Sequence, residues 1–119
     1  MRALELYKNE LSSIPESFGD LASLEAIGLS NNNIKTIPSQ LKNLTLITEI
    51  GIKFNPLDKF PQFFKKYPVL KIVAVDDEQN IQFDDNLREL CQKGVDVIEF
   101  KRDGKSFWRC YPSSWLTPY

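Results

Sequence analysis

Hydrophobic positions recur along this chain at a fixed spacing of 23 residues. One column holds Leu6, Leu29, Ile52 and Val75. Two further apolar columns keep the same spacing: Leu4, Ile27, Ile50 and Val73, and Met1, Leu24, Ile47 and Leu70. A fixed period of this length is typical of a stacked repeat array rather than a closed globule. The pattern therefore predicts a solenoid, whose function is to present a surface rather than to run a reaction.

Each repeat begins with a short strand, as the copy that starts at Leu24 illustrates. Leu24, Ile27 and Leu29 have the spacing L-x-x-L-x-L. Because side chains alternate along a strand, a strand over about 26–29 turns Ile27 and Leu29 toward the core. Stacked copies would place one such strand per repeat side by side in a parallel sheet.

The second half of the repeat predicts a tight helix on the other side of the array. Pro38 suits the first position of a helix, since its φ is fixed and its missing N–H is not needed there. Leu41 and Leu44, three positions apart, fit one face of a 3₁₀ or single-turn helix. Pro15 and Pro61 occupy the same position in the neighbouring copies.

Asparagine follows the strand in three copies, at Asn9, Asn32 and Asn55. A buried turn leaves backbone N–H and C=O groups that need partners. An asparagine side chain offers two donors and an acceptor, so the three residues are predicted to form a structural asparagine ladder. None of them begins a glycosylation sequence, and a catalytic role has no support from their surroundings.

These residues resemble the leucine-rich repeat family in its 23-residue form, L-x-x-L-x-L-x-x-N-x-L-x-x-I-P-x-x-L-x-x-L-x-x, similar to bacterial leucine-rich repeat proteins. Here the repeat reads LEAIGLSNNNIKTIPSQLKNLTL, and the resemblance extends from Met1 to about Leu90. It implies an α/β fold, a right-handed solenoid with a parallel sheet on the concave face and short 3₁₀ or α-helices on the convex face. It also implies a protein partner bound through the concave strand face.

The fourth copy departs from the pattern. Glu78 stands where asparagine is expected, and the proline is missing. The stretch 84–94 predicts a longer α-helix instead, with Asn86 and Glu89 spaced as a capping box and Gly94 as the stop signal.

A fifth strand is expected next. Val95, Ile98 and Phe100 repeat the L-x-x-L-x-L spacing, starting 25 positions after Leu70, so these three side chains are predicted to face the core. Asp103 and Gly104 then mark a turn.

Two regions follow from this division: a solenoid over 1–104, with about four repeats plus a fifth strand, and an aromatic C-terminal cap over 105–119. The second region holds Phe107, Trp108, Tyr111, Trp115 and Tyr119. Such a tail also suits sugar or peptide binding. A lid is favoured, because an open solenoid end exposes apolar core that large rings cover efficiently.

At the other end, Met1 already lies on a repeat column, so the first strand is expected to have an unpaired edge. Such edges pair readily with another chain. Either the protein forms a homo-oligomer through this edge, or the chain is a piece of something longer. No signal peptide or membrane span is visible, which suggests a cytoplasmic protein if the start is native and leaves an extracellular one open if the chain is a fragment.

Composition narrows the class of partner. The net charge of −1 gives no general attraction to nucleic acid or to an anionic membrane. Cys91 and Cys110 are too few for a disulfide scaffold, and two partly buried free thiols are favoured over a bridge between them.

Catalytic chemistry lacks its usual residues, so no enzyme activity and no cofactor are predicted. The chain has no histidine, no metal-binding Cys or His spacing and no glycine-rich phosphate loop. Asp76, Asp77 and Glu78 could hold a calcium ion loosely. The favoured interpretation is a solvated strand end, because the alternating ligand spacing of a calcium loop is absent.

The predicted binding surface is the strand face that looks away from the core. Gly28, Gly51 and Ala74 form a row of small residues there. Around this row both signs of charge occur, which suits selective protein contact better than nucleic-acid binding. The predicted partner-binding residues are Glu5, Tyr7, Glu25, Ser30, Glu49, Lys53, Lys71, Asp76, Glu99 and Lys101.

Overall fold

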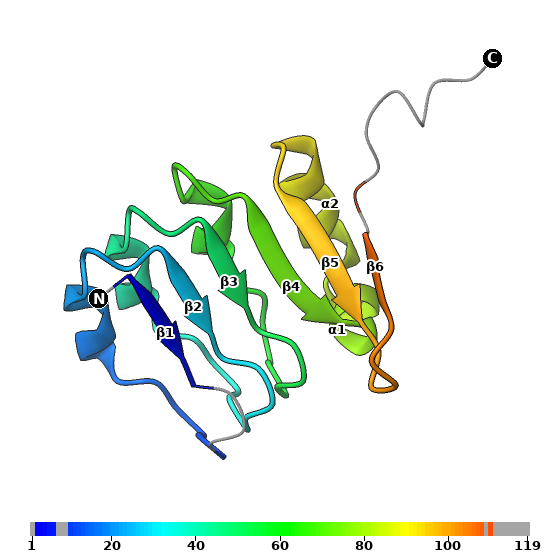
Figure 1. Cartoon of the computed structure of the whole chain (residues 1–119), viewed down its shortest axis with the longest axis horizontal. Coiled ribbons are helices and arrows are strands. Elements are labelled where there is room, and N and C mark those ends of the chain that lie inside the picture. Colours follow the sequence, from blue (N-terminus) through cyan, green and yellow to red (C-terminus); the bar gives the residue numbers. More distant parts are fainter. Residues whose placement is uncertain (1, 7–9, 109, 111–119) are drawn as a thin grey trace.

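A computed structural model of the chain describes residues 2–6, 10–108 and 110. These residues form a sheet whose strands follow one another in chain order, with helices behind it (Figure 1). The six strands are β1 (Ala3–Glu5), β2 (Ala26–Gly28), β3 (Glu49–Gly51), β4 (Ile72–Asp76), β5 (Asp96–Phe100) and β6 (Ser106–Trp108). The first five run parallel, and β6 pairs with β5 in the antiparallel direction.

The 23-residue period appears directly in the strand register. Leu4 lies opposite Ile27, Ile27 opposite Ile50, and Ile50 opposite Val73. The predicted strands and their stacking in a parallel sheet are confirmed. Each repeat therefore places the same position of its strand in the same row of the sheet.

Three 3₁₀-helices lie behind the sheet: η1 (Glu16–Asp20), η2 (Ser39–Asn43) and η3 (Gln62–Lys66). Each begins directly after a proline of the repeat, Pro15, Pro38 or Pro61. The sequence predicted proline at the first helical position, but in the structure each proline lies one residue earlier, with an extended backbone (ψ of 139° at Pro38). Its fixed φ thus suits the entry to the helix rather than its first turn.

The core fills the space between the sheet and these helices. Ile50 and Val73 from the strands and Leu41 and Phe64 from the helices are all 1% exposed or less. Burial of one such side chain stabilises the fold by about 1.5–3 kcal/mol. The core is therefore continuous along the array, as expected for stacked repeats.

The fourth repeat carries two α-helices, α1 (Asp77–Gln82) and α2 (Asp84–Gln92). The predicted capping box at Asn86 and Glu89 is wrong. The capping box of this region belongs to α1, where Asp76 accepts from the backbone N–H of Gln79 and the Gln79 side chain accepts from the backbone N–H of Asp76. The predicted stop is confirmed, because Gly94 follows α2 with a φ of +87°, which favours glycine.

The predicted phase of the fifth strand is also wrong. Val97 lies opposite Val73 and is fully buried, whereas Ile98 lies opposite Ala74 and is half-buried. Burial decides between the two phases: the one-residue shift brings Val97 into the core row and turns Ile98 and Phe100 to the other face of the sheet.

Cys91 in α2 and Cys110 after β6 form a disulfide, with their Cα atoms 5.4 Å apart. The interpretation of two free thiols is therefore wrong. The sequence offered only a separation of 19 positions, whereas the antiparallel return of β6 along β5 brings Cys110 back to α2. Most of the predicted cap, residues 109 and 111–119, lies outside the described residues.

Candidate partner-binding surface

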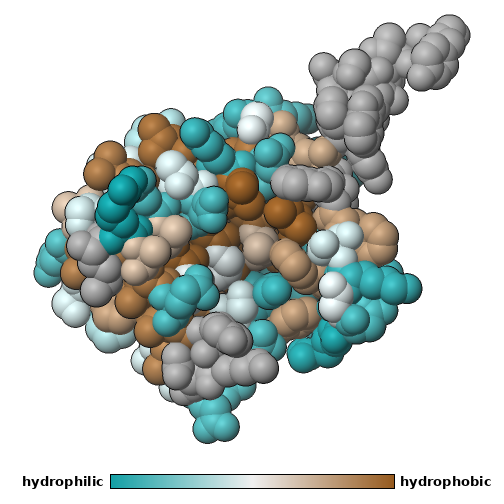
Figure 2. Space-filling view, viewed as in Figure 1, coloured by the Kyte–Doolittle hydropathy of each residue, from teal (hydrophilic) through white to brown (hydrophobic). Residues whose placement is uncertain are grey.

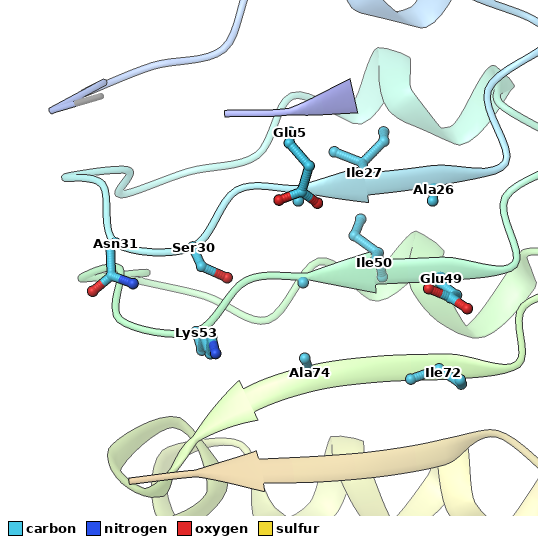
Figure 3. A pocket seen from close by; sticks show the side chains of 12 residues that line it. Glu5, Ala26, Ile27, Ser30, Asn31, Glu49, Ile50, Lys53, Ile72 and Ala74 are labelled. Atoms are coloured by element: carbon cyan, nitrogen blue, oxygen red, sulfur yellow. The ribbon is translucent and has the colours of Figure 1, made fainter. Parts of the chain in front are cut away.

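We call the face of the sheet that is turned away from the helices the open face (Figure 1). It carries a pocket of about 510 Å³, whose lining side chains are drawn in Figure 3. Its lining comes from the first four strands and the residues that follow them: Glu5, Ala26, Ile27, Gly28, Ser30, Asn31, Glu49, Ile50, Gly51, Lys53, Ile72 and Ala74. Four of the predicted partner-binding residues, Glu5, Ser30, Glu49 and Lys53, are thus brought together.

Small residues form the floor of the pocket, because Gly28, Gly51 and Ala74 lie opposite one another in three adjacent strands. A Cβ atom at Gly51 would make only ordinary contacts, the nearest at 3.5 Å from the Ser30 hydroxyl oxygen. At Gly28 a Cβ would overlap the Glu5 carboxylate, whose side chain lies across that glycine (Figure 3). The pocket is therefore open over β3 and covered by a flexible side chain over β2.

Both signs of charge border the pocket. Glu5 and Glu49 are exposed, and neither carboxylate has an ion-pair partner among the described residues. Lys53 stands two positions beyond Gly51, on the same face of β3 as Glu49 (Figure 3). At about 3.3 Å per residue, the Cα atoms of Glu49 and Lys53 lie about 13 Å apart. The surface thus presents an acidic and a basic point at opposite ends of one strand.

Aromatic side chains adjoin the basic point. The Lys53 ammonium lies 3.6 Å from the centre of the Phe100 ring and 5.9 Å from that of Phe54. The Arg102 guanidinium lies 4.6 Å from the Phe54 ring. These four residues, which we call the aromatic–cation cluster, continue the open face beyond the pocket toward β5. In space-filling view this face shows apolar residues over the middle of the sheet and hydrophilic ones around them (Figure 2).

Three of the four cluster residues were missed by sequence reasoning. Phe100 was assigned to the core through the wrong phase of β5. Phe54 and Arg102 lie in the bends that follow β3 and β5, where alternation along a strand no longer gives the direction of a side chain. A lysine or arginine close to a phenylalanine recurs at the ends of β3 and β5, on either side of β4, and this is the signal that could have found them.

Three predicted site residues lie elsewhere. Asp76 is only 4% exposed, and its carboxylate accepts from the backbone N–H groups of Phe54 and Gln79, so the prediction of a solvated strand end is wrong. Glu99 lies on the helix side of the sheet, where it accepts from the Asn80 amide at 2.9 Å. Lys101 lies on the same side, with its ammonium 5.3 Å from the Phe107 ring.

Two more predicted residues precede their strands. Glu25 forms an ion pair with Arg2, whose guanidinium hydrogen bonds hold the pKa of the Glu25 carboxyl below its ordinary value. Lys71 is exposed at the start of β4, and neither it nor Glu25 lines the pocket. Tyr7 lies outside the described residues, as does Asn9 of the predicted ladder.

The buried side-chain amides of Asn32 and Asn55 form hydrogen bonds with backbone carbonyls at the ends of the strands. Asn55 donates to the carbonyl of Leu29 in the preceding repeat at 2.8 Å and to that of Ile52 in its own at 3.1 Å. Asn32 bonds in the same way to Leu6 and Leu29, at 2.7 and 3.0 Å. These bonds cross the repeat boundary, so they fix the position of one strand end relative to the next.

Within the described residues, no group of three or more histidine, cysteine, aspartate or glutamate side chains is placed to hold a metal ion. Nor is any helix of that part long and apolar enough to cross a membrane.

A family model described as leucine rich repeat matches residues 1–57. No curated protein gives a significant sequence match to the chain. Domains of this family generally mediate protein–protein interaction and are typically non-enzymatic. The match over residues 1–57 supports a leucine-rich repeat protein, and the strand register keeps the same 23-residue period beyond it.

Proposed function

We propose that this protein is a non-enzymatic interaction module that binds a protein partner through its open face. The observation that carries the proposal is the pocket of about 510 Å³, whose rim holds carboxylates and an ammonium without oppositely charged partners in the described structure. Such groups favour binding of a partner that places opposite charges next to them. The small-residue floor gives a partner side chain room to approach the strands.

Protein suits this surface better than nucleic acid. A nucleic-acid site needs a stripe of lysine and arginine, and its affinity comes from neutralised phosphates. Here Glu5 and Glu49 line the same pocket as Lys53, and the net charge of the chain is −1. Repulsion of phosphates by the two carboxylates opposes that use.

The remaining features of the predicted architecture belong to the same proposal. A right-handed solenoid with a concave sheet is supported by the general handedness of parallel strand–crossover–strand connections. A division into a solenoid over 1–104 and a cap over 105–119 is supported by β6 and by the Cys91–Cys110 disulfide, which join the second region to the end of the array.

A steric block tests the proposed surface without removing any charge. Gly51→Trp should abolish binding of the natural partner, isolated with the wild-type chain by pulldown and mass spectrometry, because the new ring fills the pocket. The Cβ atom itself fits at this position, so the fold should survive. Lys42→Glu, an exposed change on η2 behind the sheet, serves as the control. Unchanged binding by Gly51→Trp would place the partner site elsewhere.

A second candidate function is structural self-assembly through β1. This strand is the first in the sheet, so its outer edge has no strand partner within the described residues. Exposed edges of this kind pair with another chain. Sedimentation or light scattering over a range of concentrations decides the question, and a monomer at the highest concentration would exclude a homo-oligomer.

A further inference from the structure

The aromatic–cation cluster holds two cations in fixed positions on the open face. Lys53 lies against Phe100, and Arg102 lies against Phe54, while Lys53 also approaches the Phe54 ring. A cation over an aromatic face is attracted by the ring and loses part of its conformational freedom. The two cations are therefore held in place before any partner arrives, which lowers the entropy cost of binding.

Contact with a ring face does not satisfy the hydrogen-bond donors of either group. An ammonium has three donors and a guanidinium has five, and the guanidinium donors lie in the plane of the group, at its edge. Neither Lys53 nor Arg102 forms an ion pair within the described part of the chain. Both therefore remain able to bind an oxygen acceptor, and the edge of an arginine matches a carboxylate with two parallel bonds.

The other end of the pocket has the opposite character. Glu49, about 13 Å from Lys53 along β3, and Glu5 over β2 both carry carboxylates that form no ion pair with any described residue. A partner that placed a second carboxylate there would be repelled, whereas a lysine or arginine would be attracted. The charge pattern thus defines both a preferred orientation and an excluded one.

We propose that the partner is a polypeptide segment with an acidic residue next to an apolar one at the aromatic–cation cluster, and a basic residue toward Glu49. The carboxylate binds between the Lys53 ammonium and the Arg102 guanidinium, and the apolar side chain packs on the half-buried rings of Phe54 and Phe100. This inference rests on the proposed function, because it assigns the chemistry of the partner at the same surface.

A displayed library of random twelve-residue peptides, selected on the immobilised full-length chain, provides the probe. Wild-type protein should enrich peptides that carry aspartate or glutamate beside an apolar residue. The double variant Lys53→Glu, Arg102→Glu should reverse this preference and enrich lysine and arginine, with at least tenfold weaker binding of the wild-type peptides. Circular dichroism checks that the variant is folded, and Lys42→Glu, Lys66→Glu, two exposed changes on η2 and η3, controls for the change in net charge.

Separate outcomes distinguish the inference from the function on which it rests. If Gly51→Trp abolishes binding of the selected peptides but these show no acidic preference, or if the double reversal leaves the preference unchanged, the open face binds and the assigned partner chemistry is wrong. If Gly51→Trp has no effect, or if no peptide is enriched on the wild-type chain, the open face is not the binding surface and both proposals fail.

Discussion

The side-chain amide of Gln79 donates a hydrogen bond to the carbonyl of Ile52 at 2.9 Å, where the repeat pattern places an asparagine one position earlier. Asn55 reaches Leu29 in the same way, and Asn32 reaches Leu6. The fourth repeat has thus replaced asparagine by a longer amide displaced by one residue. The bond across the repeat boundary is kept although the residue that the family pattern requires is absent.

Loss of this amide should destabilise the whole array. Gln79→Ala leaves the buried carbonyl of Ile52 without that donor and removes half of the capping box, which should cost about 1–3 kcal/mol of unfolding free energy. Urea denaturation measures the loss. Asn33→Ala, at an exposed turn position whose side chain is not needed for these bonds, is the control. Equal stability of the two variants would show that the replacement of asparagine has no structural role.

Two glycines should respond in opposite ways to alanine. A Cβ at Gly19 would stand 2.5 Å from the backbone oxygen of Gln40, so η1 and η2 would have to separate, at a cost of about 1–3 kcal/mol. Gly51→Ala meets no close neighbour and should change stability by less than about 0.5 kcal/mol. Thermal unfolding of both variants makes the comparison, and a similar midpoint for the two would contradict it.

The disulfide should stabilise the chain measurably. The bridge closes a loop between cysteines 19 positions apart and restricts the unfolded chain. Its loss should therefore lower the free energy of unfolding by about 3 kcal/mol. Reductant should therefore lower the unfolding midpoint of the wild-type chain and leave that of Cys91→Ser, Cys110→Ser unchanged. Two reactive thiols in the protein purified under oxidising conditions would show that the bridge does not form.

The ion pair between Arg2 and Glu25 predicts a specific titration. The Arg2 guanidinium lowers the pKa of the Glu25 carboxyl, so this pair stabilises the fold above the ordinary glutamate pKa and ceases to do so as the pH falls through the lowered value. Arg2→Ala should return the Glu25 titration, followed by NMR, to a higher pH. Raised salt should move it in the same direction, because both groups are solvent-accessible. A titration that is insensitive to both changes would exclude the pair in solution.

The regular repeats could be predicted from sequence because each position is specified several times. Leu24, Ile27 and Pro38 each recur in the neighbouring copies, so strand, core row and 3₁₀-helix follow from one pattern. This pattern could not predict which side chains of the fifth strand face the core. Val95 fits the start of either phase, and only packing shows that Val97, rather than Ile98, completes the buried row.

The same limit applies to the binding surface. Glu49 and Lys53 follow from alternation along a strand whose phase is certain, and both line the pocket. The position of Phe100 on the open face could be predicted only with the correct phase of β5. The burial of Asp76 could be predicted only if the start of α1 at this residue was known. Sequence therefore specified the surface where the repeats are regular, and the structure was needed where they end.

The antiparallel strand β6 and the disulfide to α2 also determine at which end of the molecule unfolding begins. In a solenoid each repeat touches only its neighbours, so structure is lost by fraying inward from the ends. One end is closed by a reversed strand and a covalent bond, whereas β1 contributes three residues to the sheet and has a neighbour on one side within the described structure. Unfolding is therefore directional: amide protons of β1 and β2 should exchange first and those of β4 and β5 last, and the aromatic–cation cluster lies at the end that persists longest.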